Sequence, residues 1–260
     1  MFRVHKAFFS IFEDLKHSMK NLASFFFISC LVLLGNTSFG QSGYMDNALN
    51  YSRLIKEKTA DGSYKLIGTF KVVGTSYLFG EKNKGNLFCP DVKAYNIQLN
   101  YNTYNQEVEF FSTANPDKPL IKEPGTVDSF TILTNISRGI TQPLKFVYGS
   151  KLGTTEKAFF MELYAGPRFS IYKRYKSELG YVSTNYIQPE LRQFDLIYDY
   201  FYSDSAKQGL KRLKPNSSSI IKEFKNIKDI TPVFNNDDFT MNQEAALRKA
   251  FEYLNQDGGF

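Results

Sequence analysis

The sequence lacks tryptophan and is poor in histidine and cysteine. Both histidines, His5 and His17, precede residue 19, and the two cysteines are Cys30 and Cys89. If the N-terminal segment is removed by export, one cysteine and no histidine remain. Such a chain cannot form a Ser-His-Asp or Cys-His catalytic centre, a histidine metal site or a cysteine-rich zinc site. We therefore expect no metal and no cofactor. The lack of the commonest group that titrates near neutral pH also weighs against an enzyme.

Long apolar runs are also missing. Residues 22–34 are thirteen residues without a charge. This is shorter than the about 20 residues of a membrane-spanning helix but fits the about 7–15 residues of a signal-peptide core. Lys20 precedes the run, and Ser38 and Gly40 follow it in the small-x-small spacing that a signal peptidase cleaves. We predict cleavage after Gly40, so that the exported chain begins at Gln41.

Two alternatives concern the same region. Without cleavage, the segment would remain as a membrane anchor, and Cys30 is a formal candidate for a lipid anchor. Apolar residues follow Cys30 where a lipoprotein has a polar start, so we reject the lipid anchor. Glu13 and Asp14 are unusual ahead of an export segment. We therefore expect translation to begin at Met19, with residues 1–18 as an extension.

The charge balance is mild. The net charge is +6 for the whole chain and +4 for the part that begins at Gln41. So small an excess predicts no binding to nucleic acid. We expect a periplasmic or extracellular protein with no integral membrane span after cleavage. Its single cysteine, Cys89, cannot form an internal disulfide and is expected to be a small buried apolar residue.

From residue 64 onward the sequence has the composition of short β-strands. Ile97, Leu99 and Tyr101 alternate with polar residues, and a turn at 102–105 precedes a second apolar stretch, which predicts a hairpin. No helical stretch between residues 64 and 175 is long enough for a parallel crossover. The sequence therefore predicts an α+β fold with a mainly antiparallel curved β-sheet or meander and a C-terminal helical segment. Further strands are predicted at 64–67, 70–73, 77–79, 127–133, 144–148, 158–164 and 168–175.

The C-terminal part contains one ambiguous segment and two predicted helices. Residues 194–202 fit a helical stripe, but their β-branched and aromatic content favours a strand, which we predict. Asn216 or Ser217 is expected to cap a helix. A final helix is expected to begin between Thr240 and Asn242 and to end at the glycines 258–259. The predicted regions are 1–40 (extension and signal peptide), 41–63 (lead-in segment), 64–214 (antiparallel β region) and 215–260 (helices packing on the sheet).

An ordered series of aromatic and turn residues runs from residue 76 to residue 255. It comprises 76–79, Ile97-x-Leu99-x-Tyr101, Tyr104-Asn105, Ser129-Phe130, Tyr164, 173–175 and 251–255. This series resembles an uncharacterised family of exported proteins from Bacteroidetes-type bacteria. The family has no established activity. The resemblance therefore implies export and this architecture, and it adds no catalytic residue.

Two pairs of carboxylates have the spacing of acid–base chemistry. Glu107 and Glu109 share one face of a predicted strand, as paired carboxylates that act on glycosides do. Their alternation with Val108 favours a solvated face of the sheet instead. Asp195 and Asp199 also share a face, and we interpret them as charges that keep an aromatic strand soluble.

Two other clusters have simple structural explanations. Residues 235–238 offer four oxygen-bearing side chains, but their spacing is wrong for an EF-hand, and a turn before the last helix explains them. The basic clusters at 173–176 and 211–214 could contact anionic lipid or acidic glycan. Protection of edge strands by positive charge also explains them and is the favoured interpretation.

Abundant tyrosine is the positive signal, because tyrosine combines apolar area with a polar tip that suits binding faces. We predict a secreted or periplasmic non-catalytic protein that binds an envelope protein, a lipid or a glycan through an aromatic-rich sheet. Its candidate binding residues are Tyr198, Tyr200, Tyr202, Lys173 and Arg174. The alternative is a carboxylate-dependent hydrolase that acts on envelope carbohydrate.

Overall fold

The computed structural model describes residues 51–122, 125–181 and 191–256. All of them belong to one compact unit, Asp46–Phe260. The predicted signal peptide, the cleavage site at Gln41 and the glycines 258–259 lie outside the described residues.

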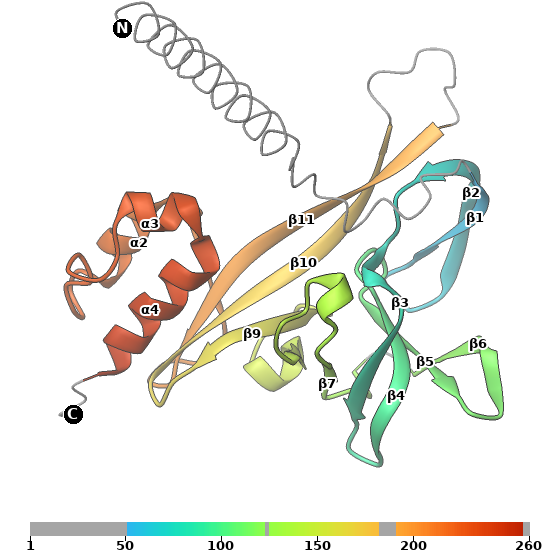
Figure 1. Cartoon of the computed structure of the whole chain (residues 1–260), viewed down its shortest axis with the longest axis horizontal. Coiled ribbons are helices and arrows are strands. Elements are labelled where there is room, and N and C mark those ends of the chain that lie inside the picture. Colours follow the sequence, from blue (N-terminus) through green and yellow to red (C-terminus); the bar gives the residue numbers. More distant parts are fainter. Residues whose placement is uncertain (1–50, 123–124, 182–190, 257–260) are drawn as a thin grey trace, which may run out of the picture. The chain divides into compact units, whose positions relative to one another are not determined.

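A mainly antiparallel sheet of twelve strands makes up most of the described chain (Figure 1). The strand order is β1-β2-β11-β10-β9-β8-β7-β3-β4-β5-β6, with β12 paired to β11. Of the described pairs, only β2 and β11 run parallel. This confirms the predicted α+β fold with a mainly antiparallel sheet. The strands are β1 (Tyr51–Lys58), β2 (Tyr64–Val73), β3 (Tyr77–Phe88), β4 (Lys93–Asn102), β5 (Glu107–Ser112), β6 (Asn115–Ile121), β7 (Ser129–Ile132), β8 (Leu144–Tyr148), β9 (Phe159–Ala165), β10 (Phe169–Tyr181), β11 (Leu191–Asp204) and β12 (Lys211–Leu213).

The strand predictions differ from the structure mainly at the N-terminal end. The β4–β5 hairpin and the strand across residues 194–202 are confirmed. The sheet, however, begins at Tyr51, because β1 pairs with β2 inside the expected lead-in segment 41–63. β1 contains the alternating charges Lys56, Glu57 and Lys58, so its sequence lacks the apolar alternation by which a half-buried strand is recognised.

Asparagine side chains cap the three α-helices found in the described residues. Asn216 accepts from the backbone N–H of Ser219 at the start of α2 (Ser217–Phe224), as predicted. Asn242 caps α4 (Gln243–Asn255) in the same way. The turn predicted at 235–238 is instead the cap and first turn of a separate helix, α3 (Asn236–Met241). Two short 3-10 helices lie at Ile136–Arg138 and Gly149–Leu152.

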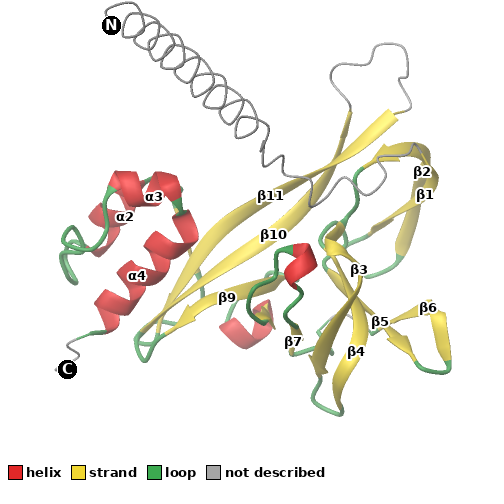
Figure 2. Cartoon of the chain, in the orientation of Figure 1, coloured by secondary structure: helices red, strands yellow, loops and turns green. Residues whose placement is uncertain are grey.

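The helices α2, α3 and α4 lie together beside one end of the β10–β11 hairpin (Figure 2). Phe251 of α4 is fully buried, with its ring centroid 5.3 Å from that of Phe224 on α2 and 6.2 Å from that of Tyr202 on β11. Asn255 fixes the other end of α4, since its Oδ1 accepts from the backbone N–H of Arg168 and Phe169 at 2.9 and 3.0 Å. Helices and sheet therefore share one core. Cys89 is buried and unpaired as predicted, and burial raises the pKa of its thiol.

Candidate functional site

The sheet curls so that strands distant in its order come into contact. The turn between β4 and β5 contacts β10. The hydroxyl groups of Thr103 and Ser177 form a hydrogen bond of 2.6 Å, and the backbone N–H of Ser177 donates to the carbonyl oxygen of Thr103 at 3.1 Å. On the other side of this turn, the ring of Tyr104 lies 5.5 Å from that of Phe194 on β11. The curl also brings the β1–β2 hairpin over β5, although these strands lie near opposite edges of the sheet.

Glu107 and Glu109 of β5 lie beneath this contact. Their exposed fractions are 5% and 6%, so the predicted solvated face is wrong. Lys58 at the end of β1 and Tyr64 at the start of β2 both donate to Oε1 of Glu107. The face that alternation assigned to solvent is covered by a hairpin that lies about fifty residues earlier in the chain.

The two carboxylates have different environments. Glu107 forms an ion pair with Lys58. Glu109 is held by neutral donors, the Tyr77 hydroxyl at 3.0 Å and the Asn100 side-chain N–H at 3.1 Å. Burial raises the pKa of Glu109, and its hydrogen bonds offset part of that rise. A buried carboxyl group with a raised pKa is a candidate for acid–base chemistry.

Two adjoining hollows share Glu107, and Glu109 lines one of them. The tyrosine hollow, of about 500 Å³, is lined by the aromatic rings of Tyr64, Tyr77, Tyr104 and Phe194 together with Glu107 and Glu109. The lysine hollow, of about 570 Å³, is lined by Lys58, Lys122, Lys157 and Lys176 among others. Tyr104, Asn105 and Glu107 line both hollows. The Glu-x-Glu spacing was visible in the sequence, but the aromatic walls depend on the curl of the sheet.

The sequence-predicted binding residues lie elsewhere, on β10 and β11. Lys173 is 7% exposed, and its Nζ lies 3.9 Å from the ring centroid of Tyr198 and 5.7 Å from that of Tyr200. The same Nζ is 2.6 Å from Oε1 of Glu244 in the first turn of α4. Lys173 therefore holds α4 on the sheet, through its cation–π contacts with the tyrosines of β11 and its ion pair with Glu244.

Tyr202 and Arg174 do not join that group. The Tyr202 hydroxyl donates to Glu223 on α2, and the residue is 7% exposed. Arg174 pairs with Glu156 and with Asp199, on the face of β10 opposite to Lys173. The five predicted residues are thus divided between two faces. Of the three tyrosines, only Tyr198, at 47%, is exposed.

A pH test distinguishes the charged from the neutral form of Glu109. Because its pKa is raised above the ordinary 4.5, this carboxyl stays protonated to a higher pH in the folded protein than in the unfolded chain, and its contribution to stability falls as pH rises above 4.5. Glu109→Gln removes this cost, so its stability relative to wild type is expected to rise between pH 4 and pH 7. Urea unfolding at several pH values measures the difference. Glu178→Gln, at a carboxylate 54% exposed, is the control, and a gap for Glu109→Gln that is constant with pH would contradict the assignment.

The described residues contain neither a helix that could span a membrane nor a group of metal-ligating side chains. Among residues 51–122, 125–181 and 191–256, no helix has the length and apolar character needed to cross a membrane. In these ranges no three histidine, cysteine or acidic side chains are grouped as metal ligands.

Comparisons with known proteins give one partial likeness. No family model and no solved structure match the chain. The chain is similar to a phospho-N-acetylmuramoyl-pentapeptide-transferase of Borrelia garinii subsp. bavariensis, with 33% identity over 99 residues. The match covers 35% of this chain and 26% of that protein. The chain thus spans about a quarter of that relative's length, and the likeness does not show a family.

Proposed function

We propose that this is an exported, non-catalytic protein that binds a glycan in the tyrosine hollow. The observation that carries the proposal is the pair of buried carboxylates, Glu107 and Glu109, in a hollow with four aromatic rings. Aromatic faces suit the apolar faces of sugar rings, and carboxylate and amide oxygens accept hydrogen bonds from sugar hydroxyls. A concave site with apolar walls and a few fixed polar groups is typical of small-ligand binding.

The geometry favours a glycan over the other ligand classes that the sequence left open. A lipid carrier would need an apolar cavity between sheet and helices, and buried Phe224, Leu247 and Phe251 occupy that contact. Binding through the tyrosines of β11 would need an accessible surface, and Tyr200 is 3% exposed. Export of the chain rests on the signal-peptide pattern of residues 20–40 and belongs to the proposal.

A glycan array tests the binding proposal. Fluorescently labelled protein is expected to bind one class of glycan on the array. Tyr104→Ala is expected to weaken that binding about tenfold or more, by analogy with the stacking of nucleic-acid bases on an aromatic ring, which is worth about 1–3 kcal/mol. Tyr95→Ala, which removes a tyrosine 62% exposed on β4 outside the hollow, is the matched control. If the protein binds no glycan on the array, the proposed function is contradicted. If Tyr104→Ala binds the glycan as tightly as wild type does, the proposed site is contradicted.

One observation favours a second function, a carboxylate-dependent glycoside hydrolase. Glu109 has a raised pKa, and the neighbouring Glu107 is ion-paired, as an acid and a base or nucleophile would be. Glu107 and Glu109 are two residues apart on β5. Their side chains therefore lie on one face of β5, as paired carboxyl groups of a glycosidase do. The glycan that binds on the array is incubated with wild type, with Glu107→Gln and with Glu109→Gln, and its cleavage is measured. Cleavage by wild type but by neither variant would show that the protein is a hydrolase and not a binding protein only.

A further inference from the structure

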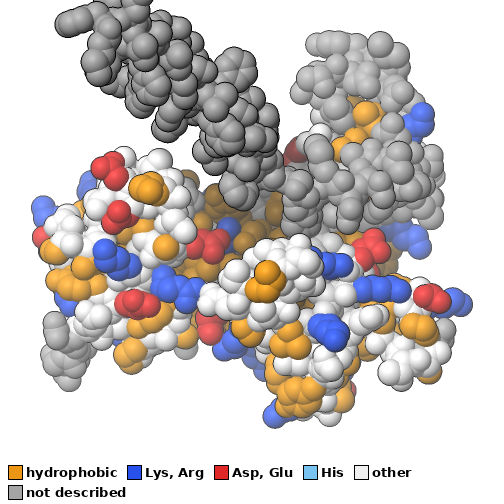
Figure 3. Space-filling model, in the orientation of Figure 1, with side chains coloured by type: hydrophobic (Ala, Val, Ile, Leu, Met, Phe, Trp, Pro, Cys, Tyr) orange, Lys and Arg blue, Asp and Glu red, His pale blue; other side chains and the backbone are white. Residues whose placement is uncertain are grey.

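The lysine hollow gathers positive side chains from four separate elements. Lys58 ends β1, Lys122 follows β6, Lys157 precedes β9, and Lys176 lies on β10. Three glutamates line the same hollow, Glu57, Glu107 and Glu178, so lysine exceeds glutamate by one. Elsewhere, on the face seen in Figure 3, basic and acidic side chains are interspersed.

The partners of these lysines decide which of them can meet a ligand. Lys58 forms an ion pair with the buried Glu107 and is therefore not available to a ligand. Lys122 and Lys176 pair with Asp91 and Glu178, whose side chains are 69% and 54% exposed. Such exposed pairs contribute about 0–1 kcal/mol and exchange readily for another anion.

Lys157 has no carboxylate within ion-pair distance among the described residues, and its Nζ donates to the carbonyl oxygen of Ala60 at 3.2 Å. Lys157 and Lys176 both line the lysine hollow. An anion can reach these two lysines without breaking a buried ion pair.

The two hollows adjoin, since Tyr104, Asn105 and Glu107 line both of them. A glycan that lies across these shared residues would place one ring in the tyrosine hollow and a substituent or neighbouring sugar in the lysine hollow. Glu107 is one of these shared residues, and Lys58 compensates its charge, whereas Glu57 also lines the lysine hollow and acts electrostatically on Tyr104. An acidic group on the ligand meets attraction from Lys157 and Lys176 without direct repulsion from an unpaired Glu107.

We propose that the glycan is acidic, and that a carboxylate on it contacts Lys157 and Lys176 while a neighbouring ring lies against Tyr104. This inference rests on the proposed function and names the ligand class of the same site. It predicts binding that weakens with salt, because charges at the partly exposed wall of the hollow are screened over about 10 Å at 0.1 M salt.

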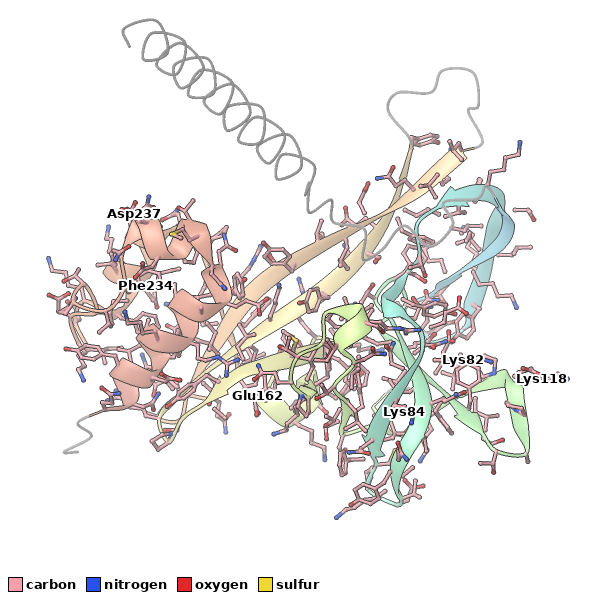
Figure 4. The ribbon with its side chains drawn as sticks, in the orientation of Figure 1. Lys82, Lys84, Lys118, Glu162, Phe234 and Asp237 are labelled. Atoms are coloured by element: carbon pink, nitrogen blue, oxygen red, sulfur yellow. The ribbon has the colours of Figure 1, made fainter. Side chains whose placement is uncertain are left out.

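Matched ligands that differ only in charge test the proposal. Tetragalacturonate and a hyaluronan tetrasaccharide are each compared with their methyl esters by titration calorimetry at low and high salt. We expect at least one acid to bind about fivefold or more tightly than its ester. Lys157→Gln is expected to remove that preference and leave ester binding unchanged. Lys84→Gln, at an exposed lysine of β3 outside both hollows (Figure 4), is expected to change neither.

Each outcome decides between the two proposals. Equal binding of acid and ester, or a preference that survives Lys157→Gln, would overturn the acidic-glycan inference and leave glycan binding intact. Failure of both acids to bind would also overturn it. Only an empty glycan array would overturn the function as well. Thermal unfolding of Lys157→Gln checks that the variant is folded.

Discussion

Replacing Lys58 with methionine is expected to lower the free energy of unfolding by about 3–5 kcal/mol at pH 7. Lys58 compensates the charge of Glu107, whose side chain is 4% exposed, and the lysine side chain itself is 15% exposed. Without the lysine, a carboxylate would remain buried with only the Tyr64 hydroxyl and no counter-charge at this position. Urea unfolding followed by tyrosine fluorescence measures the loss.

The controls separate the charge from the packing. Lys65→Met changes an exposed lysine on the same hairpin and is expected to cost less than about 0.5 kcal/mol. The double variant Lys58→Met with Glu107→Gln is expected to recover much of the loss, since it leaves no unpaired charge. A loss below about 1 kcal/mol in Lys58→Met would show that this pair does not hold β1 against β5.

Phe251→Ala is expected to destabilise the protein by about 3–5 kcal/mol, through lost apolar burial and the cavity that remains. The ring is fully buried and contacts Phe224 on α2 and Tyr202 on β11. Because one side chain joins helices and sheet, both parts should unfold in one transition in wild type and in the variant.

Circular dichroism at 222 nm and tyrosine fluorescence follow the helices and the sheet separately. Met241→Ala, at a side chain 86% exposed on α3, is the control and should change stability by less than about 0.5 kcal/mol. Separate transitions for the two signals would contradict the common core. A loss below about 1 kcal/mol for Phe251→Ala would do the same.

Local signals predicted much of the fold. Period-two alternation located the β4–β5 hairpin, and asparagine and serine before apolar stripes located the start of α2 and of α4. These signals arise from interactions between residues close together in the chain, which can be predicted from the local sequence alone. β1 was missed because charged residues fill it, and its place in the sheet depends on pairing with β2.

The candidate site was predicted only in part, for a related reason. The spacing of Glu107 and Glu109 was visible, but their burial depends on the β1–β2 hairpin, which arrives through the curl of the sheet. The same long-range packing placed Glu244 of α4 against Lys173. A lysine that reads as a surface charge in the sequence is therefore buried between tyrosines.

The most direct test of the account is to locate the glycan on the protein by NMR. Isotope-labelled protein is titrated with the glycan that the array retains, and backbone amide shifts are mapped onto the structure. The account predicts that the largest shifts fall in residues 56–64 and 104–109, around Glu107 and Glu109, and that they disappear in Tyr104→Ala. Shifts concentrated instead at Tyr198 and the start of α4 would place the ligand on the outer surface of β11 and contradict the account.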